Sequence, residues 1–244
     1  MKNFWFFVLA LLLINEKIIA FDSCRKEKQL FFDEKLFKEK LIESIEDLKD
    51  KNESFIKNKD VLVEYILCLD IYYKYFEKDG ERKKKEYKKL IDYLESLLKE
   101  NDSPEIYYCL TILYGRYAEK CNIWDAVKMN IPNKIKKYAE IVVEKKPEID
   151  GYGAFLILGR LFYITPKVPY YTNWQSFEKS EIFLKKYIEK NQNSITGKLF
   201  LAETYKANKK FDLYDSLINE IVSTTNFDNF QDKKIHDSIT GNMK

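Results

Sequence analysis

LGRLF at residues 158–162 and LAETY at residues 201–205 share one feature: an aromatic residue follows a leucine by four positions. Two earlier stretches show the same spacing. The four leucine–aromatic pairs are Leu69/Tyr73, Leu113/Tyr117, Leu158/Phe162 and Leu201/Tyr205. Successive pairs begin 44, 45 and 43 residues apart, by subtraction of the leucine positions. So regular a period predicts a chain built from repeated structural units.

The composition of the chain and its helix-boundary residues predict an all-α fold. Only 7 Gly and 5 Pro occur among 244 residues, and no segment alternates apolar and polar residues over a strand's length. Ser103 and Pro104 suit an N-cap and a first helical position. Predicted helices cover residues 28–50, 60–78, 82–100, 104–121, 133–146, 151–164, 175–190, 195–207 and 210–223. Taken in order, the last eight pair into four antiparallel hairpins, and the first covers one open end of the stack.

The N-terminus predicts an export signal. Lys2 precedes an apolar run from Phe4 to Ile14, which is shorter than the roughly 20 residues that span a membrane. Two maturation routes stay open, namely cleavage after Ala20 and lipidation of Cys24 at a loose lipobox. The predicted domains are therefore a secretory signal peptide over residues 1–23, a helical repeat domain over 24–224 and a polar, disordered tail over 225–244.

Charge and cysteine content narrow the function. The chain has 42 Lys and Arg against 39 Asp and Glu, a net charge of +3, which does not suit a nucleic-acid partner. Cys109 and Cys121 are predicted to lie about 18 Å apart on one helix, too far for a disulfide. Buried free thiols are expected, although a Cys68–Cys109 bridge between neighbouring helices remains an alternative in an oxidising compartment.

Few residues suggest catalysis. The one histidine, His236, lies in the polar tail, so a Ser-His-Asp or Cys-His set is not assembled. Closely spaced metal ligands are missing, and the glycines of GYG at residues 151–153 follow no strand, unlike a phosphate loop. We therefore predict that the protein is not an enzyme and uses no cofactor or metal; a hidden pair of carboxylates is the one enzymatic alternative.

The stretches quoted first resemble the L-G/A-x-x-Y core of a tetratricopeptide repeat. At Gly159 the motif continues only if about nine residues are inserted between the paired helices; Ser180 and Leu184 then take the motif's later positions. The inserted segment is residues 165–174, rich in Pro and aromatic residues. The same allowance fits the second hairpin. The stack is therefore expected to be a tetratricopeptide-like solenoid of about four repeats.

The combination of DGYGA at residues 150–154, LGRLF, a Pro-containing insertion, FEKS at 177–180 and LAETY is similar to the TatT family. These are periplasmic tetratricopeptide lipoproteins associated with TRAP-type (tripartite, ATP-independent periplasmic) solute transporters. The resemblance is clearest over residues 150–222. It implies a helper that docks an extracytoplasmic solute-binding protein, assembles as a homo-oligomer and carries an internal cavity for an apolar ligand.

Two groups of residues are candidates for binding. In the insertion, Tyr170, Tyr171 and Trp174 suit a protein-binding surface; the alternative is a loop that packs Trp174 on its own repeat. The aromatics of the four leucine pairs are better explained as repeat core. Their neighbours on the first helices of each pair are the candidates for a groove surface: Tyr108, Arg116, Arg160 and Lys206.

These observations predict an exported all-α repeat protein of a bacterial periplasm or envelope, anchored to the membrane if Cys24 carries lipid, that binds a protein partner. One interpretation is a TatT-like accessory component of TRAP-type uptake. The other is a general tetratricopeptide scaffold for cell-wall or outer-membrane assembly. A buried apolar cavity would favour the first, and a solid core with an exposed groove would favour the second.

Overall fold

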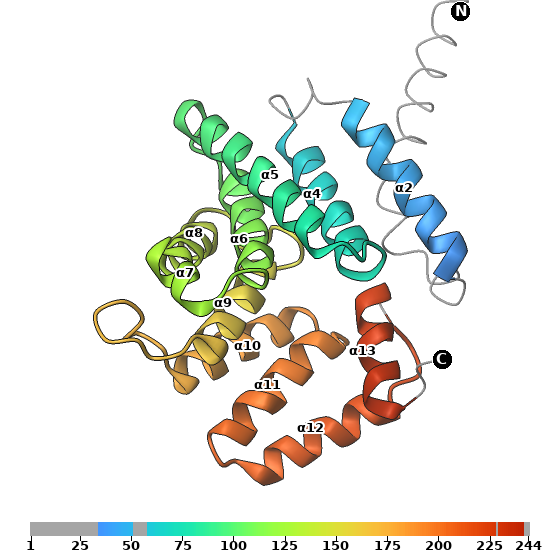
Figure 1. The fold of residues 1–244 in the computed structure, drawn as a ribbon. Helices are drawn as coiled ribbons and strands as arrows, with labels where there is room; N and C mark the ends of the chain where they lie inside the picture. Colours follow the sequence, from blue (N-terminus) through green and yellow to red (C-terminus); the bar gives the residue numbers. More distant parts are fainter. Residues whose placement is uncertain (1–33, 51–57, 228, 242–244) are drawn as a thin grey trace, which may run out of the picture.

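The computed structural model describes residues 34–50, 58–227 and 229–241. Over these residues the chain is all-helical, as the sequence predicts, with eleven helices and no strand (Figure 1). Residues 1–23 and Cys24 lie outside the described part, so the export signal and both maturation routes stay predictions. In the described segments, no helix combines the length and apolar character that crossing a membrane requires.

Nine helices follow the predicted order, and two, α7 and α13, were not predicted. The bounds are α2 (Glu34–Asp50), α4 (Lys59–Tyr75), α5 (Gly80–Glu100), α6 (Pro104–Ala118), α7 (Ile123–Lys128), α8 (Ile131–Lys145), α9 (Gly153–Ile164), α10 (Phe177–Lys190), α11 (Ile195–Ala207), α12 (Phe211–Ser223) and α13 (Phe230–Thr240). Side-chain caps fix several starts: the Asp79 carboxylate accepts from the Glu81 and Arg82 amides at 3.0 Å. Ser103 precedes Pro104 as expected but makes no cap bond; its hydroxyl donates to Glu105 at 2.5 Å instead.

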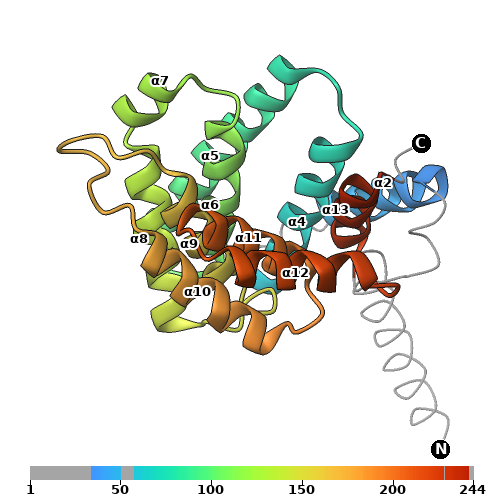
Figure 2. The ribbon, with the colours of Figure 1, turned by 90° about the horizontal axis from the view of Figure 1, so that it is seen from below.

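The helices pack in sequential pairs. α6 lies against α8, α9 against α10, and α11 against α12, and each of these first helices also packs on the second helix of the preceding pair (Figures 1 and 2). The first pair is more open: α4 and α5 both pack on α6 and meet each other through side chains, such as the Tyr73 and Tyr87 rings, 5.5 Å apart. α2 packs on α4, which agrees with the predicted cover for one end.

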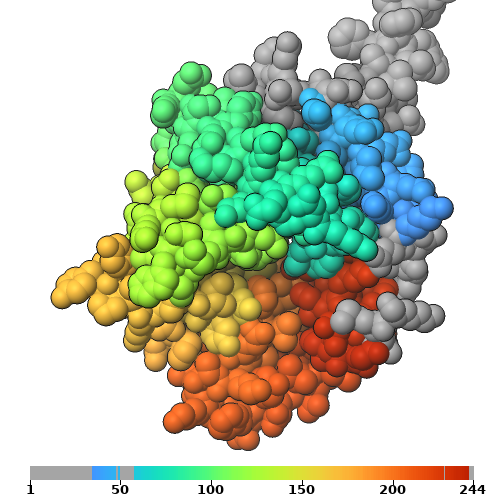
Figure 3. Space-filling view, viewed as in Figure 1, coloured from blue at the N-terminus to red at the C-terminus, as the bar shows by residue number. Residues whose placement is uncertain are grey.

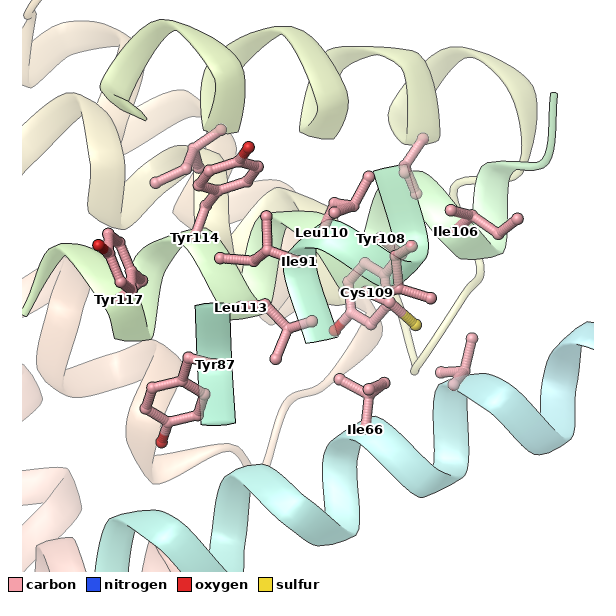
Figure 4. Packing of buried hydrophobic residues seen from close by; sticks show 14 of the residues in the cluster. Ile66, Tyr87, Ile91, Ile106, Tyr108, Cys109, Leu110, Leu113, Tyr114 and Tyr117 are labelled. Atoms are coloured by element: carbon pink, nitrogen blue, oxygen red, sulfur yellow. The ribbon is translucent and has the colours of Figure 1, made fainter. Parts of the chain in front are cut away.

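The leucine–aromatic pairs form the seam of the core. All four leucines are buried, together with Tyr117, Phe162 and Tyr205, whereas Tyr73 is partly exposed. Around α6 the seam is dense, with side chains from α4, α5 and α6 converging (Figure 4). The cysteines of the described part are free thiols, so the alternative Cys68–Cys109 bridge is not formed.

Gly159, the residue after Leu158, allows the paired helices α9 and α10 to approach closely. An alanine methyl at Gly159 would stand 2.5 Å from Leu184 Cγ, so only glycine fits between α9 and α10. Leu184 is fully buried at the position that the repeat pattern predicts for it. In the second repeat, Tyr114 replaces the small residue and donates its hydroxyl to Glu95 of α5 at 2.5 Å. This larger side chain is accommodated because its polar end reaches a partner.

The C-terminal segment corrects the prediction of a disordered tail over residues 225–244. Residues Phe230–Thr240 form α13, which packs on α11 and α12. Asn229 caps it, accepting from the Asp232 amide at 2.8 Å. Phe230 is 2% exposed and joins a core cluster of α2 and α4. The polar composition of the segment concealed these few anchoring side chains.

Candidate binding surface

Two insertions meet at one edge of the molecule. Residues 119–130, which include α7, connect α6 to α8, and residues 165–176 connect α9 to α10. Asn133 at the start of α8 links them. Its amide nitrogen donates to the Asn130 side-chain oxygen at 2.6 Å and to the Tyr171 carbonyl at 3.1 Å, and its amide oxygen accepts from the Trp174 indole at 2.6 Å. We call residues 119–130 and 165–176 the insertion edge (Figures 1 and 2).

Large apolar side chains are exposed along this edge. Tyr170 is 98% exposed and belongs to the loop of residues 165–176, which projects from the molecular surface (Figure 3). Trp124 of α7 is 64% exposed. Twelve large apolar residues are exposed in the described part of the chain, and six belong to the edge or adjoin it. Those six are Ile123, Trp124, Met129, Ile164, Tyr170 and Tyr171. Exposed apolar side chains gathered in this way are typical of interaction surfaces.

The loop of the edge is held by its own contacts. The Thr172 hydroxyl, which is buried, accepts from the Val168 amide at 2.9 Å and donates to the Pro166 carbonyl at 2.6 Å. Trp174 packs edge-on against the Phe162 ring, with centroids 5.5 Å apart. These contacts fix the backbone conformation of the projecting loop. Little backbone entropy would therefore be lost if a partner bound there.

Tyr170 carries backbone strain. Its φ of 67° is in the left-handed region, which costs a residue other than glycine about 1 kcal/mol. The side chain makes no use of that conformation inside the fold, because it is almost fully exposed. Tyr170 lies in a turn in which the Tyr171 and Thr172 amides donate to the Val168 carbonyl at 3.1 and 2.9 Å, so the conformation serves the turn.

The three aromatic candidates of the loop thus separate into two roles. Tyr170 and Tyr171 are exposed and available to a partner. Trp174 is partly buried on Phe162 and bonded to Asn133, so the alternative prediction, packing on its own repeat, describes it correctly. It positions the loop and is not a principal contact.

A shallow hollow lies beside Trp174 on α8. Three lysines and one glutamate line it, which gives it an excess of positive charge. Its lining residues are Asn130, Asn133, Lys134, Lys136, Lys137, Tyr138, Glu140 and Trp174. Lys134 is also bonded to Glu95 at 2.9 Å, and Lys136 is paired with Glu140 at 2.7 Å. Two of its three lysines are therefore already paired with carboxylates of the protein itself.

Tyr108 is not a groove residue, contrary to the prediction. It is 2% exposed, and its hydroxyl donates to the Asp150 carboxylate at 2.7 Å. The ring occupies the space left by Gly153, where a methyl group would stand 2.1 Å from the Tyr108 oxygen. The sequence could not show this contact because the two residues are 45 positions apart, by subtraction, on α6 and α9.

Arg116 links α6 to α4. Its guanidinium binds both carboxylate oxygens of Asp70, with one bond at 2.8 Å, and also Glu119 at 2.8 Å. Burial of the guanidinium would lower the pKa of Arg116, but the Asp70 carboxylate outweighs it, so the pKa is raised and the charge is retained. The side chain is 21% exposed and satisfied within the fold, which leaves it little capacity for a partner.

Arg160 and Lys206 are not brought together into one groove. Arg160 pairs with Glu203 of α11, and its guanidinium lies 4.3 Å from the centre of the Phe200 ring. Lys206 is exposed, with its ammonium 5.2 Å from the Tyr214 ring centre. Of the four predicted groove residues, Lys206 is the one that is fully exposed, and the Arg160 side chain is 31% exposed.

The sequence argument missed Ile123, Trp124 and Met129. The repeat period does locate an insertion in the second hairpin, but the apolar residues inside it were not followed. α7 buries Ala126 and Val127 and turns Ile123 and Trp124 outward. Within the described residues, His, Cys, Asp and Glu form no group of three that could hold a metal ion.

Comparison with protein-family models and with curated proteins finds no match for this chain. The fold and the edge therefore define its class directly: an all-helical protein with an exposed apolar surface made by two insertions.

Proposed function

We propose that this chain is an exported tetratricopeptide-like scaffold that binds a protein partner through the insertion edge. The observation that carries the proposal is the exposure of six large apolar side chains on two adjacent insertions. A helical repeat does not need these insertions for its own packing. Their aromatic and methionine content is typical of protein interfaces.

The packing order supports a solenoid of four repeats. From the second pair onward, the first helix of each pair packs against two helices. These are the second helix of its own pair and the second helix of the preceding pair. Ion pairs between successive first helices, Asp70–Arg116 and Arg160–Glu203, add to this stacking. The regular interval of the leucine pairs agrees with such units.

The chemistry of the edge indicates its partner. Tyr170, Tyr171 and Trp124 supply rigid, amphipathic contact area. In the context of the TatT resemblance, the proposed partner is an extracytoplasmic solute-binding protein of a TRAP-type system. In that role the chain is a docking component and performs no reaction.

The second candidate is a general scaffold for cell-wall or outer-membrane assembly. The two surface hollows favour it, because both are open and lined in part by charged residues, for example Glu95 and Lys99 in the hollow between α5 and α8. An apolar ligand would require an enclosed, apolar space instead. The proposal for the edge is the same in both cases, and only the identity of the partner differs.

Crosslinking from the native envelope tests the proposal. A photoreactive phenylalanine analogue is placed at Tyr170, and at Phe211 of α12 as a control; Phe211 is 55% exposed but lies outside the edge. We expect a crosslinked protein from position 170 only. Recovery of a solute-binding protein supports the first candidate, and recovery of wall-synthesis proteins alone supports the second.

A binding assay with the recovered partner then measures the edge directly. We expect the triple variant Trp124→Ala/Tyr170→Ala/Tyr171→Ala to bind at least about tenfold more weakly, since aromatic anchors each contribute about 1 kcal/mol or more. The matched control is Tyr93→Ala/Phe211→Ala, which removes exposed aromatics elsewhere. Equal affinity of the folded triple variant and the control would refute a role for the edge.

A further inference from the structure

A surface groove runs between α5 and α8. Both helices pack on α6 but have little contact with each other, so side chains of α6 form the floor (Figure 1). The rings of Tyr107 and Tyr114 on α6 have their centroids 5.2 and 6.4 Å from that of Tyr138 on α8. The ion pair of Lys134 with Glu95 bridges the two walls. We call this feature the α8 groove.

The α8 groove connects the end of α5 with the insertion edge. The hollow between α5 and α8 and the hollow beside Trp174 are both parts of it, because Tyr138 lines both. Their volumes are about 400 and 440 Å³. The first hollow reaches Leu98 and Lys99, and the second reaches Trp174, which belongs to the insertion edge. A protein held at the edge can therefore extend a segment into the groove.

The groove has an excess of positive charge that the fold itself does not neutralise. Both carboxylates that line the two hollows are already paired with lining lysines, namely Glu95 with Lys134 and Glu140 with Lys136. Two further lining lysines, Lys99 and Lys137, are exposed, and neither forms an ion pair with a residue that the structure describes. Unpaired ammonium groups beside a groove favour a ligand that brings carboxylates.

The groove also offers apolar surface. Leu98, Tyr107 and Tyr138 pack on the main core with one side and are partly exposed on the other. Aromatic and leucine side chains of a bound segment can cover such surface, since aromatic rings contribute a large contact area. A recessed groove with an apolar floor and free lysines suits a peptide segment better than the flat surface of a bilayer.

The geometry points to the α8 groove as the site for an acidic segment of the partner protein. Its carboxylates meet Lys99 and Lys137, and an aromatic or leucine side chain covers Tyr138. The inference rests on the proposed function in one respect, since the segment belongs to the protein that the insertion edge holds. The edge supplies apolar contacts and the groove supplies charge, so the partner carries an acidic segment beside its apolar contact surface.

The test uses the full chain and two short fluorescent peptides as probes. The first has the sequence DEFDELDEYDE, and in the second every Asp is replaced by Asn and every Glu by Gln. Binding is measured by fluorescence anisotropy. We expect the acidic peptide alone to bind the wild-type protein, with an affinity that falls as the salt concentration rises. Absent binding, or equal binding of both peptides, would overturn the inference.

Charge reversal separates the groove from general attraction between a lysine-rich protein and an acidic peptide. Lys99→Glu/Lys137→Glu should bind the acidic peptide at least about tenfold more weakly than the wild type. The matched control is Lys78→Glu/Lys85→Glu, which makes the same change of net charge at two exposed lysines near the start of α5. The control should bind like the wild type, and an equal loss in both variants would contradict the inference.

A photoreactive phenylalanine in the acidic peptide locates the site. We expect crosslinks at Leu98, Tyr107 or Tyr138, and crosslinks confined to other parts of the chain would overturn the inference. Vesicles of phosphatidylglycerol are the competing anionic probe. If these vesicles bind the wild type but not Lys99→Glu/Lys137→Glu, and the acidic peptide does not bind, the occupant is a lipid surface and the inference is wrong.

Failure of the groove and failure of the insertion edge give different results. The variant Trp124→Ala/Tyr170→Ala/Tyr171→Ala leaves the α8 groove unchanged and should keep its affinity for the acidic peptide, whatever the edge binds. A missing crosslink from position 170 in the envelope counts against the edge alone. Loss of specific peptide binding counts against the groove alone.

Discussion

Gly159 of α9 is the position at which one added methyl group should most clearly disturb the stacked helices. The alanine Cβ would stand 2.5 Å from Leu184 Cγ, 2.7 Å from its Cδ2 and 3.3 Å from its backbone nitrogen. Carbon atoms in good contact are about 3.5–4.0 Å apart. Since Leu184 is fully buried, it has no free space to enter, and α9 and α10 must separate.

The expected size follows from two opposing effects. Overpacking of a core costs about 1–3 kcal/mol, while replacing glycine inside a helix gains about 1 kcal/mol. Gly159→Ala should therefore lower the free energy of unfolding by up to about 2 kcal/mol, and Tm by up to about 8 °C for a domain of this size. Gly115→Ala is the matched control: its methyl group meets nothing within 4 Å on α6, so we expect a gain of about 0.5–1 kcal/mol.

A double-mutant cycle, measured by urea unfolding followed by circular dichroism, identifies the cause. Leu184→Ala alone should cost about 2–5 kcal/mol. In that background both side-chain clashes are gone and only the 3.3 Å approach to the backbone nitrogen remains, so Gly159→Ala should become neutral or stabilising. If Gly159→Ala costs the same in both backgrounds, or behaves like Gly115→Ala in the wild type, the close approach of α9 and α10 is not the reason for the glycine.

Two further predictions concern charged groups. Burial would raise the pKa of Glu105, but hydrogen bonds from Lys146, at 2.6 Å, and from the neighbouring serine lower it below its ordinary value of 4.5. Glu105→Gln should therefore lower the free energy of unfolding by about 1–2 kcal/mol at pH 7. The difference in stability between this variant and the wild type should shrink as the pH falls below 4.5, because the stabilising charge of Glu105 is lost there. Denaturant titrations at pH 7 and pH 3.5 measure this, and a constant difference would contradict it. Arg116→Ala leaves the Asp70 carboxylate without its guanidinium partner and should lower the free energy of unfolding by about 2–4 kcal/mol. Lys88→Ala, which breaks an exposed ion pair, should change the urea midpoint little. Similar effects of the two variants would contradict the role of Arg116 in linking α6 to α4.

The sequence by itself determined nine of the eleven described helices and their order. Spacing of Leu158 and Phe162 by one helical turn places both on one face, and that rule acts within a few residues. The breaks at Asp79–Gly80 and Ser103–Pro104 are likewise local, so the predicted limits agree with the observed ones to within a few positions. The insertion at residues 165–174 was also evident, because a regular period exposes any segment that departs from it.

Only the tertiary structure decided which residues lie at the surface. Tyr108 was predicted to be exposed and is buried, because Gly153 on another helix leaves room for its ring. α13 has too few apolar residues to be recognised as a packed helix from the sequence. It is held by single side chains that reach α4 and α11. The two insertions lie at one edge of the molecule because neighbouring hairpins present the same end. Contacts between residues 40 or more positions apart depend on how helices stack, and no local pattern contains that information.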